Sequence, residues 1–240
     1  MAVGTPTLVE RLRANIATVQ ERIARAAARA GRDPAAITIV AVAKTFGPQM
    51  VEAAYAAGLR HFGENRVQEA EEKLGVLDPS VVAGSTWHLV GHLQTNKARL
   101  AARLFRVVQS IDSLRVAQAL EQGCARAGTS CDVLIQVNLA RTPGQFGLPE
   151  EAVAEVARGI LALPHLRLRG LMTIAPQVED PELVRPHFRR MRELAEQLRR
   201  AVPEASWDVL SMGMTEDFEV AVEEGATMVR LGRAIFGERH

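Results

Sequence analysis

The chain has little cysteine, few aromatic residues and no long apolar run. Its 240 residues include two cysteines, Cys124 and Cys131, and 4% of the residues are aromatic. The spacing of the two thiols matches no zinc or redox motif, and two cysteines build no disulfide framework, so we expect a reducing cytoplasm. The apolar runs are only as long as strands, whereas a membrane span needs roughly 20 residues. The amphipathic N-terminus carries acidic residues and lacks the apolar core of a signal peptide.

The chain also lacks an excess of either charge. Its 29 basic and 28 acidic residues give a net charge of +1. Proteins that bind nucleic acid or anionic membranes through electrostatics carry a clear positive excess. We therefore expect neither nucleic acid nor a membrane as a partner.

Lysine is scarce as well. Of the 29 basic residues only three are lysines, Lys44, Lys73 and Lys97, and the others are arginines. Arginine stays charged in proteins, whereas a desolvated lysine can lose its proton and act as a nucleophile. Lys44 directly follows seven uncharged residues, Ile37 to Ala43. Either its amine has a chemical role, or Lys44 ends a strand and simply extends into solvent.

Apolar runs of strand length alternate with amphipathic stretches along the chain. Strands are expected at Ile37–Lys44, His61–Gly63, Thr86–Val90, Arg106–Ser110, Asp132–Leu139, Leu166–Thr173, Trp207–Ser211 and Met228–Leu231. Helices are expected at Pro48–Ala57, Val67–Leu77, Lys97–Leu104, Leu114–Ala127, Glu150–Leu161, Leu183–Ala201 and Glu216–Glu224. A further helix precedes the first strand, with Thr5-Pro6 at its start and Gly31 at its end.

This alternation predicts a parallel sheet with right-handed crossovers. Eight strands in a chain of nearly the usual barrel length favour a closed (β/α)₈ TIM barrel over an open doubly wound sheet. No linker or shift in composition divides the chain, so we expect a single domain over residues 1–240. Active sites of such barrels lie at the carboxyl ends of the strands. Lys44 ends the first strand, and this position at the mouth favours a chemical role.

The segment after the seventh strand has groups that suit a phosphate, which this fold commonly binds near its last two strands. Ser211 offers a hydroxyl, Gly213 permits close backbone approach, and Thr215 stands where a helix is expected to begin. Glu216 and Asp217 argue against an anion, unless they face outward from the first helical turn.

The segment after the eighth strand supplies the second side of the expected phosphate site. Arg230 leaves the strand beside Gly232, and a short turn follows. A nucleophilic lysine opposite a phosphate cradle indicates a ligand that has both an aldehyde and a phosphate. Pyridoxal 5′-phosphate (PLP) has both groups.

The chain contains the segments AVAKT, HFGENRVQEAEEK, WHLVGHLQTNK, SIDS, GLMTIAP and LSMGMTEDFEVAVEEGATMVRLGRAIFG. Over residues 37–237, these segments closely resemble the YggS/PROSC family of pyridoxal phosphate homeostasis proteins. The resemblance implies a (β/α)₈ barrel similar to the N-terminal domain of alanine racemase.

The resemblance also implies which residues hold PLP. Lys44 would form the internal aldimine, a Schiff base, and Arg230 would face the pyridine nitrogen. Asn65 would be a neighbour of the site. The phosphate would lie near side-chain or backbone groups of Ser211, Gly213, Met214, Thr215, Gly232 and Arg233.

One segment departs from the family pattern. Gly144–Leu148 has the sequence GQFGL, with Gln145 where the pattern has a lysine. This difference changes the charge of a rim loop, and we expect it to leave the cofactor pocket intact.

Some conspicuous side chains are expected to have structural roles. His88 and His92 have a spacing that would suit a metal on a helix, but they flank a strand end and no HExxH carboxylate accompanies them. We therefore expect no metal site. A solvated helix face is expected for Arg189, Arg190, Arg192, Arg199 and Arg200.

Three functions are compatible with a lysine and a phosphate site. The first is a protein that stores, buffers or delivers PLP without robust turnover. The second is a PLP-dependent enzyme that acts on amino acids, such as a racemase. The third is a Schiff-base aldolase in which Lys44 attacks a phosphosugar.

A racemase needs an acid or base on each face of the substrate carbon. In alanine racemase, one is the lysine and the other is a tyrosine from a second domain. The chain ends at His240, a few residues beyond the eighth strand, and Tyr55 is its only tyrosine. A cation such as Arg230 at the pyridine nitrogen also disfavours ring protonation and weakens the electron sink. We therefore expect a monomeric PLP carrier in the cytoplasm, with PLP-dependent apoenzymes as possible partners.

Overall fold

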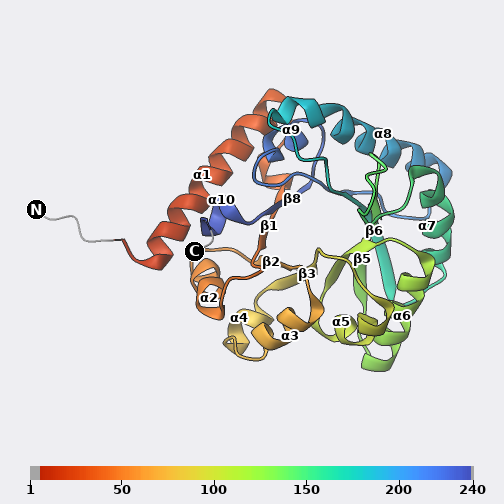
Figure 1. Cartoon of the computed structure of the whole chain (residues 1–240), viewed down its shortest axis with the longest axis horizontal. Helices are drawn as coiled ribbons and strands as arrows, with labels where there is room; N and C mark the ends of the chain where they lie inside the picture. Colours follow the sequence, from red (N-terminus) through yellow and green to blue (C-terminus); the bar gives the residue numbers. More distant parts are fainter. Residues whose placement is uncertain (1–5, 239–240) are drawn as a thin grey trace, which may run out of the picture.

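Eight parallel strands close a barrel in sequence order in the computed structural model, which describes residues 6–238 (Figure 1). The strands are β1 (Thr38–Val42), β2 (His61–Glu64), β3 (Thr86–Leu89), β4 (Val107–Ile111), β5 (Cys131–Val137), β6 (Leu166–Thr173), β7 (Val209–Ser211) and β8 (Met228–Leu231). β1 pairs with both β2 and β8, which closes the barrel. The predicted barrel and its eight strands are confirmed.

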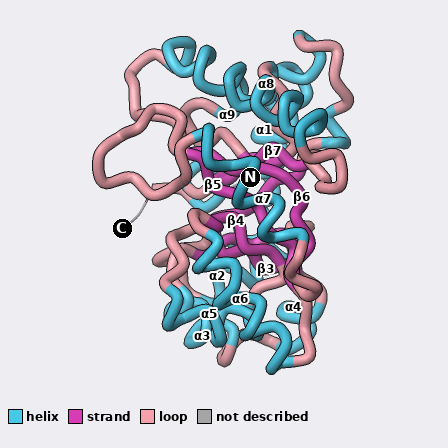
Figure 2. Tube along the Cα trace, turned by 90° about the vertical axis from the view of Figure 1, so that its right-hand side faces the viewer, coloured by secondary structure: helices cyan, strands magenta, loops and turns pink. Residues whose placement is uncertain are grey.

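Helices surround the strands on all sides of the barrel (Figure 2). They are α1 (Leu8–Arg29), α2 (Pro48–Ala56), α3 (Val67–Leu74), α4 (Pro79–Ala83), α5 (Ala98–Leu104), α6 (Leu114–Ala127), α7 (Val153–Leu161), α8 (Arg185–Ala201), α9 (Phe218–Glu223) and α10 (Arg233–Phe236). The sequence pattern did not predict the short helices α4 and α10. Within the described residues, no helix is both long and apolar enough to cross a membrane.

The leading helix begins later than the sequence predicted. Thr7 is its N-cap, and Thr7 and Glu10 form a reciprocal capping box. Pro6 therefore precedes the cap and does not belong to the first turn, whereas Thr5 lies outside the described residues. α1 packs against α9 and α10, beside the seam between β1 and β8 (Figure 1).

Polar side chains occupy part of the barrel interior. The side chain of Gln109 on β4 contacts Ser211 on β7 and Met228 on β8. β4 is not adjacent to either strand, so these contacts cross the interior. Part of the apolar filling that is usual in such a barrel is therefore replaced here by hydrogen-bonded groups.

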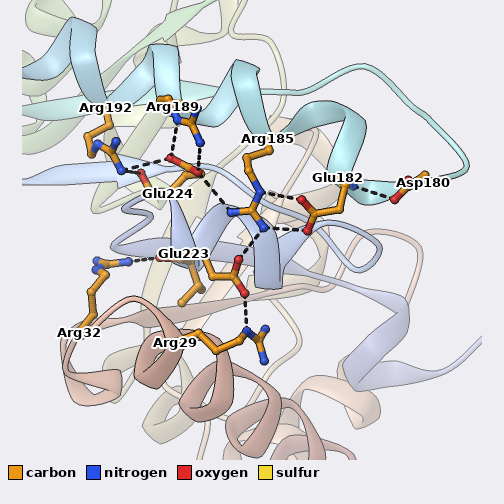
Figure 3. A network of polar contacts seen from close by, with 10 residues as sticks. Arg29, Arg32, Asp180, Glu182, Arg185, Arg189, Arg192, Glu223 and Glu224 are labelled. Carbon is orange, nitrogen blue, oxygen red and sulfur yellow. Dashed lines mark hydrogen bonds and ion pairs between the residues drawn. The ribbon is translucent and has the colours of Figure 1, made fainter.

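Of the α8 arginines predicted to form a solvated face, Arg189 and Arg192 belong to an ion-pair network (Figure 3), whereas Arg199 and Arg200 are exposed as predicted. Arg185 bonds Glu182, Glu223 and Glu224, and Glu224 also accepts hydrogen bonds from Arg189 and Arg192. Arg29 of α1 bonds Glu223 from the other side. The Glu224 carboxylate lies 3.2 Å from the Arg185 guanidinium, 3.0 Å from that of Arg189 and 3.2 Å from that of Arg192. The network links α1, α8 and the end of α9 (Figure 3).

A buried ion pair fixes the end of β1. The Lys73 ammonium on α3 donates to the Glu64 carboxylate on β2 and, at 2.7 Å, to the carbonyl oxygen of Ala43. Glu64 is fully buried, and its second oxygen has no hydrogen-bond partner among the described residues. Burial raises the pKa of Glu64, and Lys73 opposes this shift. Lys73 therefore holds the backbone immediately before Lys44.

Lys73→Met is expected to destabilise the fold by about 3–5 kcal/mol, because it leaves the Glu64 carboxylate buried without its cation. Without Lys73, the pKa of Glu64 rises further above its value in the unfolded chain. The loss relative to the parent protein should therefore be greatest at pH values above the folded pKa. It should shrink as the pH falls toward the unfolded pKa, since a protonated carboxyl costs less to bury. Urea unfolding at several pH values measures both effects.

Lys97→Met is the matched control, since Lys97 lies on the 3₁₀ turn Thr95–Lys97 and is only partly buried. It should change stability by less than about 1 kcal/mol at any pH. Equal losses in the two variants, or a loss in Lys73→Met that does not vary with pH, would contradict the assigned role of Lys73.

Candidate functional site

A cavity of about 960 Å³ lies at the carboxyl ends of the strands. It is lined by residues at or just after the ends of β1, β2, β3, β5, β6, β7 and β8. Of the residues predicted to bind PLP, the cavity is lined by Lys44, Asn65, Met214, Thr215, Arg230, Gly232 and Arg233. Ser211 and Gly213 are not among its lining residues.

Lys44 lies at the mouth of the barrel, one residue beyond the buried Ala43. Val42 also lines the cavity, as strand alternation requires for two residues of the same face. The backbone turns directly after the lysine, because Thr45 has a φ of 70°. This left-handed conformation is unfavourable for a β-branched residue and is typical of functional sites.

Arg230 is the main cation of the cavity floor. Its side chain is 5% exposed, and its guanidinium donates to Ser211 Oγ at 2.8 Å and to the Thr173 carbonyl oxygen at 2.8 Å. Burial lowers its pKa to about 10, and the nearby Asp217 carboxylate opposes this shift. At neutral pH the guanidinium is still protonated, so it presents positive charge and hydrogen-bond donors to the cavity.

Ser211 is fully buried beneath the cavity. Its hydroxyl donates to Gln109 Oε1 at 2.6 Å and accepts from Arg230. The hydroxyl therefore contacts Gln109 and Arg230, and the phosphate contact that the family resemblance implies stays a prediction.

The turn between β7 and α9 differs from the prediction in two ways. Thr215 does not begin the helix, because residues 215–217 form a turn and α9 begins at Phe218. Asp217 does not face outward, since it is 8% exposed and accepts a hydrogen bond from the Met214 amide at 2.6 Å. Burial raises the pKa of Asp217, and the Met214 amide and Arg230 oppose this shift.

Gly213 supports this turn from below. Its φ is 93°, and a Cβ there would lie 2.7 Å from the Ala221 Cβ on α9. Its carbonyl oxygen accepts from the Arg230 amide at 3.0 Å. Gly213 therefore packs the turn against α9 and β8, and its predicted place near the phosphate stays a prediction.

The turn also contacts the start of α10. Thr215 Oγ1 accepts from the Ala234 amide at 3.4 Å, and Glu216 pairs with Arg233 at 2.8 Å. Glu216 thus faces Arg233 and is neutralised by it. The acidic side chain no longer argues against an anion at this side of the cavity.

Asn65 follows β2, and its backbone lies against Gly91 beyond β3. A Cβ at Gly91 would be 2.1 Å from the Asn65 carbonyl oxygen. Only glycine permits this close approach, which places the two segments side by side in the cavity wall.

The rim contains an aromatic pair that the sequence did not predict. The rings of His92 and Phe146 stack with centroids 3.6 Å apart and an interplanar angle of 8°. Gln145 donates to the Ile174 carbonyl oxygen at 2.9 Å. Both Gln145 and Phe146 line the cavity, so the segment that departs from the family pattern forms part of its wall.

His88 and His92 do not share a site. His88 is buried inside the barrel, where it contacts His61 and Gln109, whereas His92 lies at the rim. Over residues 6–238, no cluster of histidine, cysteine and acidic residues could hold a metal ion. Tyr55 lies on α2, outside the residues that line the cavity.

Comparison with known proteins gives consistent relatives over most of the chain. Residues 9–240 match the family model of the alanine racemase N-terminal domain. The pyridoxal phosphate homeostasis protein of Aquifex aeolicus is 40% identical over 228 residues, covering 93% of this chain and 96% of the relative. The protein of the same name from Escherichia coli is 41% identical over 229 residues, covering 94% and 95%.

Solved structures agree with these relatives. PipY of Synechococcus elongatus, determined without PLP, is 36% identical and has a TM-score of 0.81, with 91% of this chain and 99% of PipY covered. PipY with PLP bound has a TM-score of 0.79 at the same identity, with 91% and 100% covered. The chain therefore belongs to the alanine racemase N-terminal domain family, together with the proteins named pyridoxal phosphate homeostasis protein.

Proposed function

We propose that this protein binds PLP and serves in its intracellular homeostasis by storing, buffering or delivering the cofactor. The observation that carries the proposal is a single cavity lined by both Lys44 and Arg230 at the mouth of the barrel. PipY, at 36% identity, has been solved with PLP bound. The relatives at about 40% identity carry the name of this function.

The groups that line the cavity fit the parts of PLP. Lys44 supplies an amine for covalent attachment. Two nitrogens of the Arg230 guanidinium donate to Ser211 and Thr173. Its remaining N–H groups can donate to a pyridine nitrogen that accepts a hydrogen bond. Thr215, Gly232 and Arg233 line the same side of the cavity, where the Thr215 hydroxyl and backbone amides of the β8–α10 turn suit a phosphate.

When bound, PLP supplies an aldehyde that condenses with an amine, releasing water, and a ring that withdraws electrons. Arg230 limits the second property, because its positive charge disfavours a proton on the adjacent ring nitrogen. Asn65 is assigned as a neighbour of the ring, and the backbone of Met214 and Thr215 as a neighbour of the phosphate, although the Met214 amide itself donates to Asp217. Ser211 is assigned a supporting role beneath Arg230. Gly213 is assigned a supporting role beneath the turn at residues 215–217, which is proposed to lie beside the phosphate.

A carrier fits this cavity better than a racemase does. Among the described residues that line it, no tyrosine is available as a second acid or base. The expected setting is the cytoplasm, and PLP-dependent apoenzymes are the expected recipients. The Schiff-base aldolase alternative has no support from the relatives.

Borohydride treatment of the purified, PLP-loaded protein should attach the cofactor irreversibly to Lys44, because reduction fixes a carbon–nitrogen double bond. Lys44→Ala should lose the visible absorption band and the label. Lys97→Ala is the matched control and should keep both, since Lys97 is not among the cavity-lining residues. Mass mapping of the peptides identifies the modified residue, and a label on Lys73 or Lys97 would overturn the assignment.

Thr215→Ala should weaken PLP binding, because it removes a hydroxyl from the proposed phosphate site. A lost hydrogen bond to a charged group costs about 1.5–3 kcal/mol, or roughly 10–150-fold in affinity. Equilibrium titration with PLP measures the loss. An unchanged dissociation constant, with the fold intact, would place the phosphate elsewhere.

Racemisation of common amino acids by the loaded protein should be very slow. Each positioned acid or base contributes about 10²–10⁴-fold to a rate, and the tyrosine that provides the second one in alanine racemase has no counterpart among the described residues that line the cavity. Chiral chromatography of alanine incubated with the protein measures the exchange. Robust turnover that Lys44→Ala abolishes would establish an enzyme instead of a carrier.

A further inference from the structure

A chain of hydrogen bonds crosses the barrel from the cavity floor to the amino end of β2. Arg230 donates to Ser211 Oγ at 2.8 Å, and Ser211 donates to Gln109 Oε1 at 2.6 Å. Gln109 Nε2 lies 3.0 Å from His88 Nδ1, and His88 Nε2 lies 3.0 Å from His61 Nδ1. The three middle residues are at most 1% exposed. The chain thus joins β8, β7, β4, β3 and β2 through the barrel interior.

The direction of each donor in this series follows from the two groups that each hydrogen bond joins. A guanidinium can only donate, so Ser211 Oγ accepts from Arg230, and the Gln109 Oε1 that faces Ser211 can only accept its proton. The Gln109 amide nitrogen must then donate to His88 Nδ1.

The same reasoning fixes both histidines. Because His88 Nδ1 accepts, a neutral His88 carries its proton on Nε2 and donates it to His61 Nδ1. Burial lowers the pKa of His88 to about 3, so the ring is neutral at neutral pH. Burial also lowers the pKa of His61. All donors therefore point from Arg230 toward His61.

A second contact holds the other side of the guanidinium. Arg230 donates to the Thr173 carbonyl oxygen at 2.8 Å. Thr173 Oγ1 donates to the Val137 carbonyl oxygen at 2.9 Å and lies 3.0 Å from His187 Nε2. His187 must therefore donate from Nε2. The guanidinium is held on two nitrogens by acceptors from different strands.

We propose that Ser211, Gln109 and His88 are positioning residues for Arg230, which fix its guanidinium so that its remaining donors face the cofactor cavity. The role toward PLP rests on the function proposed above. A polar network of this kind costs desolvation that apolar side chains would avoid, and apolar residues are the usual filling of such barrels. A cation needs fixed acceptors on its protein side to present a fixed direction on its ligand side, which gives the network its purpose.

The direction of the chain can be tested without any cofactor. Long-range proton–nitrogen NMR spectra of the ¹⁵N-labelled, PLP-free protein report which nitrogen of each histidine is protonated. At neutral pH we expect Nε2–H with an unprotonated Nδ1 for His88 and for His61. His187, expected as the same tautomer from an independent contact, is the internal reference. A proton on His88 Nδ1 would overturn the proposal, whether or not the protein binds PLP.

Gln109→Glu should reverse the direction of the hydrogen bond between residue 109 and His88. At a pH where the new carboxyl is ionised, it can accept from Ser211 but cannot donate to His88, so the His88 ring must then carry a proton on Nδ1. The NMR signal of His88 should change accordingly, while His187 keeps its tautomer. An unchanged His88 tautomer would contradict the assigned contact between Gln109 and His88.

Gln109→Met keeps a similar volume but leaves the Ser211 hydroxyl without its acceptor. We expect PLP affinity to fall by about 2- to 10-fold, the effect of one net hydrogen bond, and the pH titration of the visible band to shift. Val108→Ala is the matched control, because Val108 is the fully buried residue before Gln109 on β4 and takes no part in the hydrogen-bond chain. This control should lose stability while keeping the parent affinity and titration.

Two results would overturn the positioning role. One is a Gln109→Met protein whose affinity and titration equal those of Val108→Ala. The other is that the expected histidine tautomers are found but Gln109→Met leaves the pH titration of the visible PLP band unchanged. The hydrogen-bond chain would then exist without acting on Arg230. A parent protein that binds no PLP would instead refute the proposed function. The tautomer test would then still show whether the hydrogen-bond chain from Arg230 to His61 exists as described.

Discussion

The buried guanidinium of Arg230 is the group on which the barrel mouth depends. A cation at 5% exposure is stable only where its donors are matched by fixed acceptors, and Ser211 and Thr173 supply them from β7 and β6. This requirement explains why the barrel interior has a polar chain where branched apolar residues are usual. It also explains the burial of Asp217, whose negative charge lies near the same cation.

The walls of the cavity are held by charges outside the barrel lumen. Lys73 bonds the carbonyl oxygen of the residue before Lys44, and Glu216 pairs with Arg233 across the loops after β7 and β8. On the far side, arginines of α1 and α8 converge on Glu223 and Glu224 at the end of α9 (Figure 3). These contacts tie the segments that carry Lys44 and the turn after β7 to neighbouring elements of the barrel.

Sequence periodicity predicted the barrel because each strand and helix leaves a local pattern. Lys44 was singled out because it directly follows an apolar run, although β1 itself ends two residues earlier, at Val42. The chain through His61, His88 and Gln109 was missed, since it joins side chains of non-adjacent strands and no spacing encodes such contacts. Ser211 was assigned to phosphate because its hydroxyl precedes the turn, but its side chain contacts Gln109 and Arg230 inside the barrel. Likewise, acidic residues near a turn gave no sign that Asp217 would be buried and Glu216 neutralised.

The proposed function rests on a cavity that holds PLP between Lys44 and Arg230. A crystal structure of the protein with PLP would show this arrangement. We expect continuous density from Lys44 to the cofactor, the ring nitrogen within hydrogen-bond distance of Arg230, and the phosphate beside Thr215 and Gly232. PLP bound elsewhere, or a ring nitrogen that faces a carboxylate with the Arg230 guanidinium turned away, would contradict it.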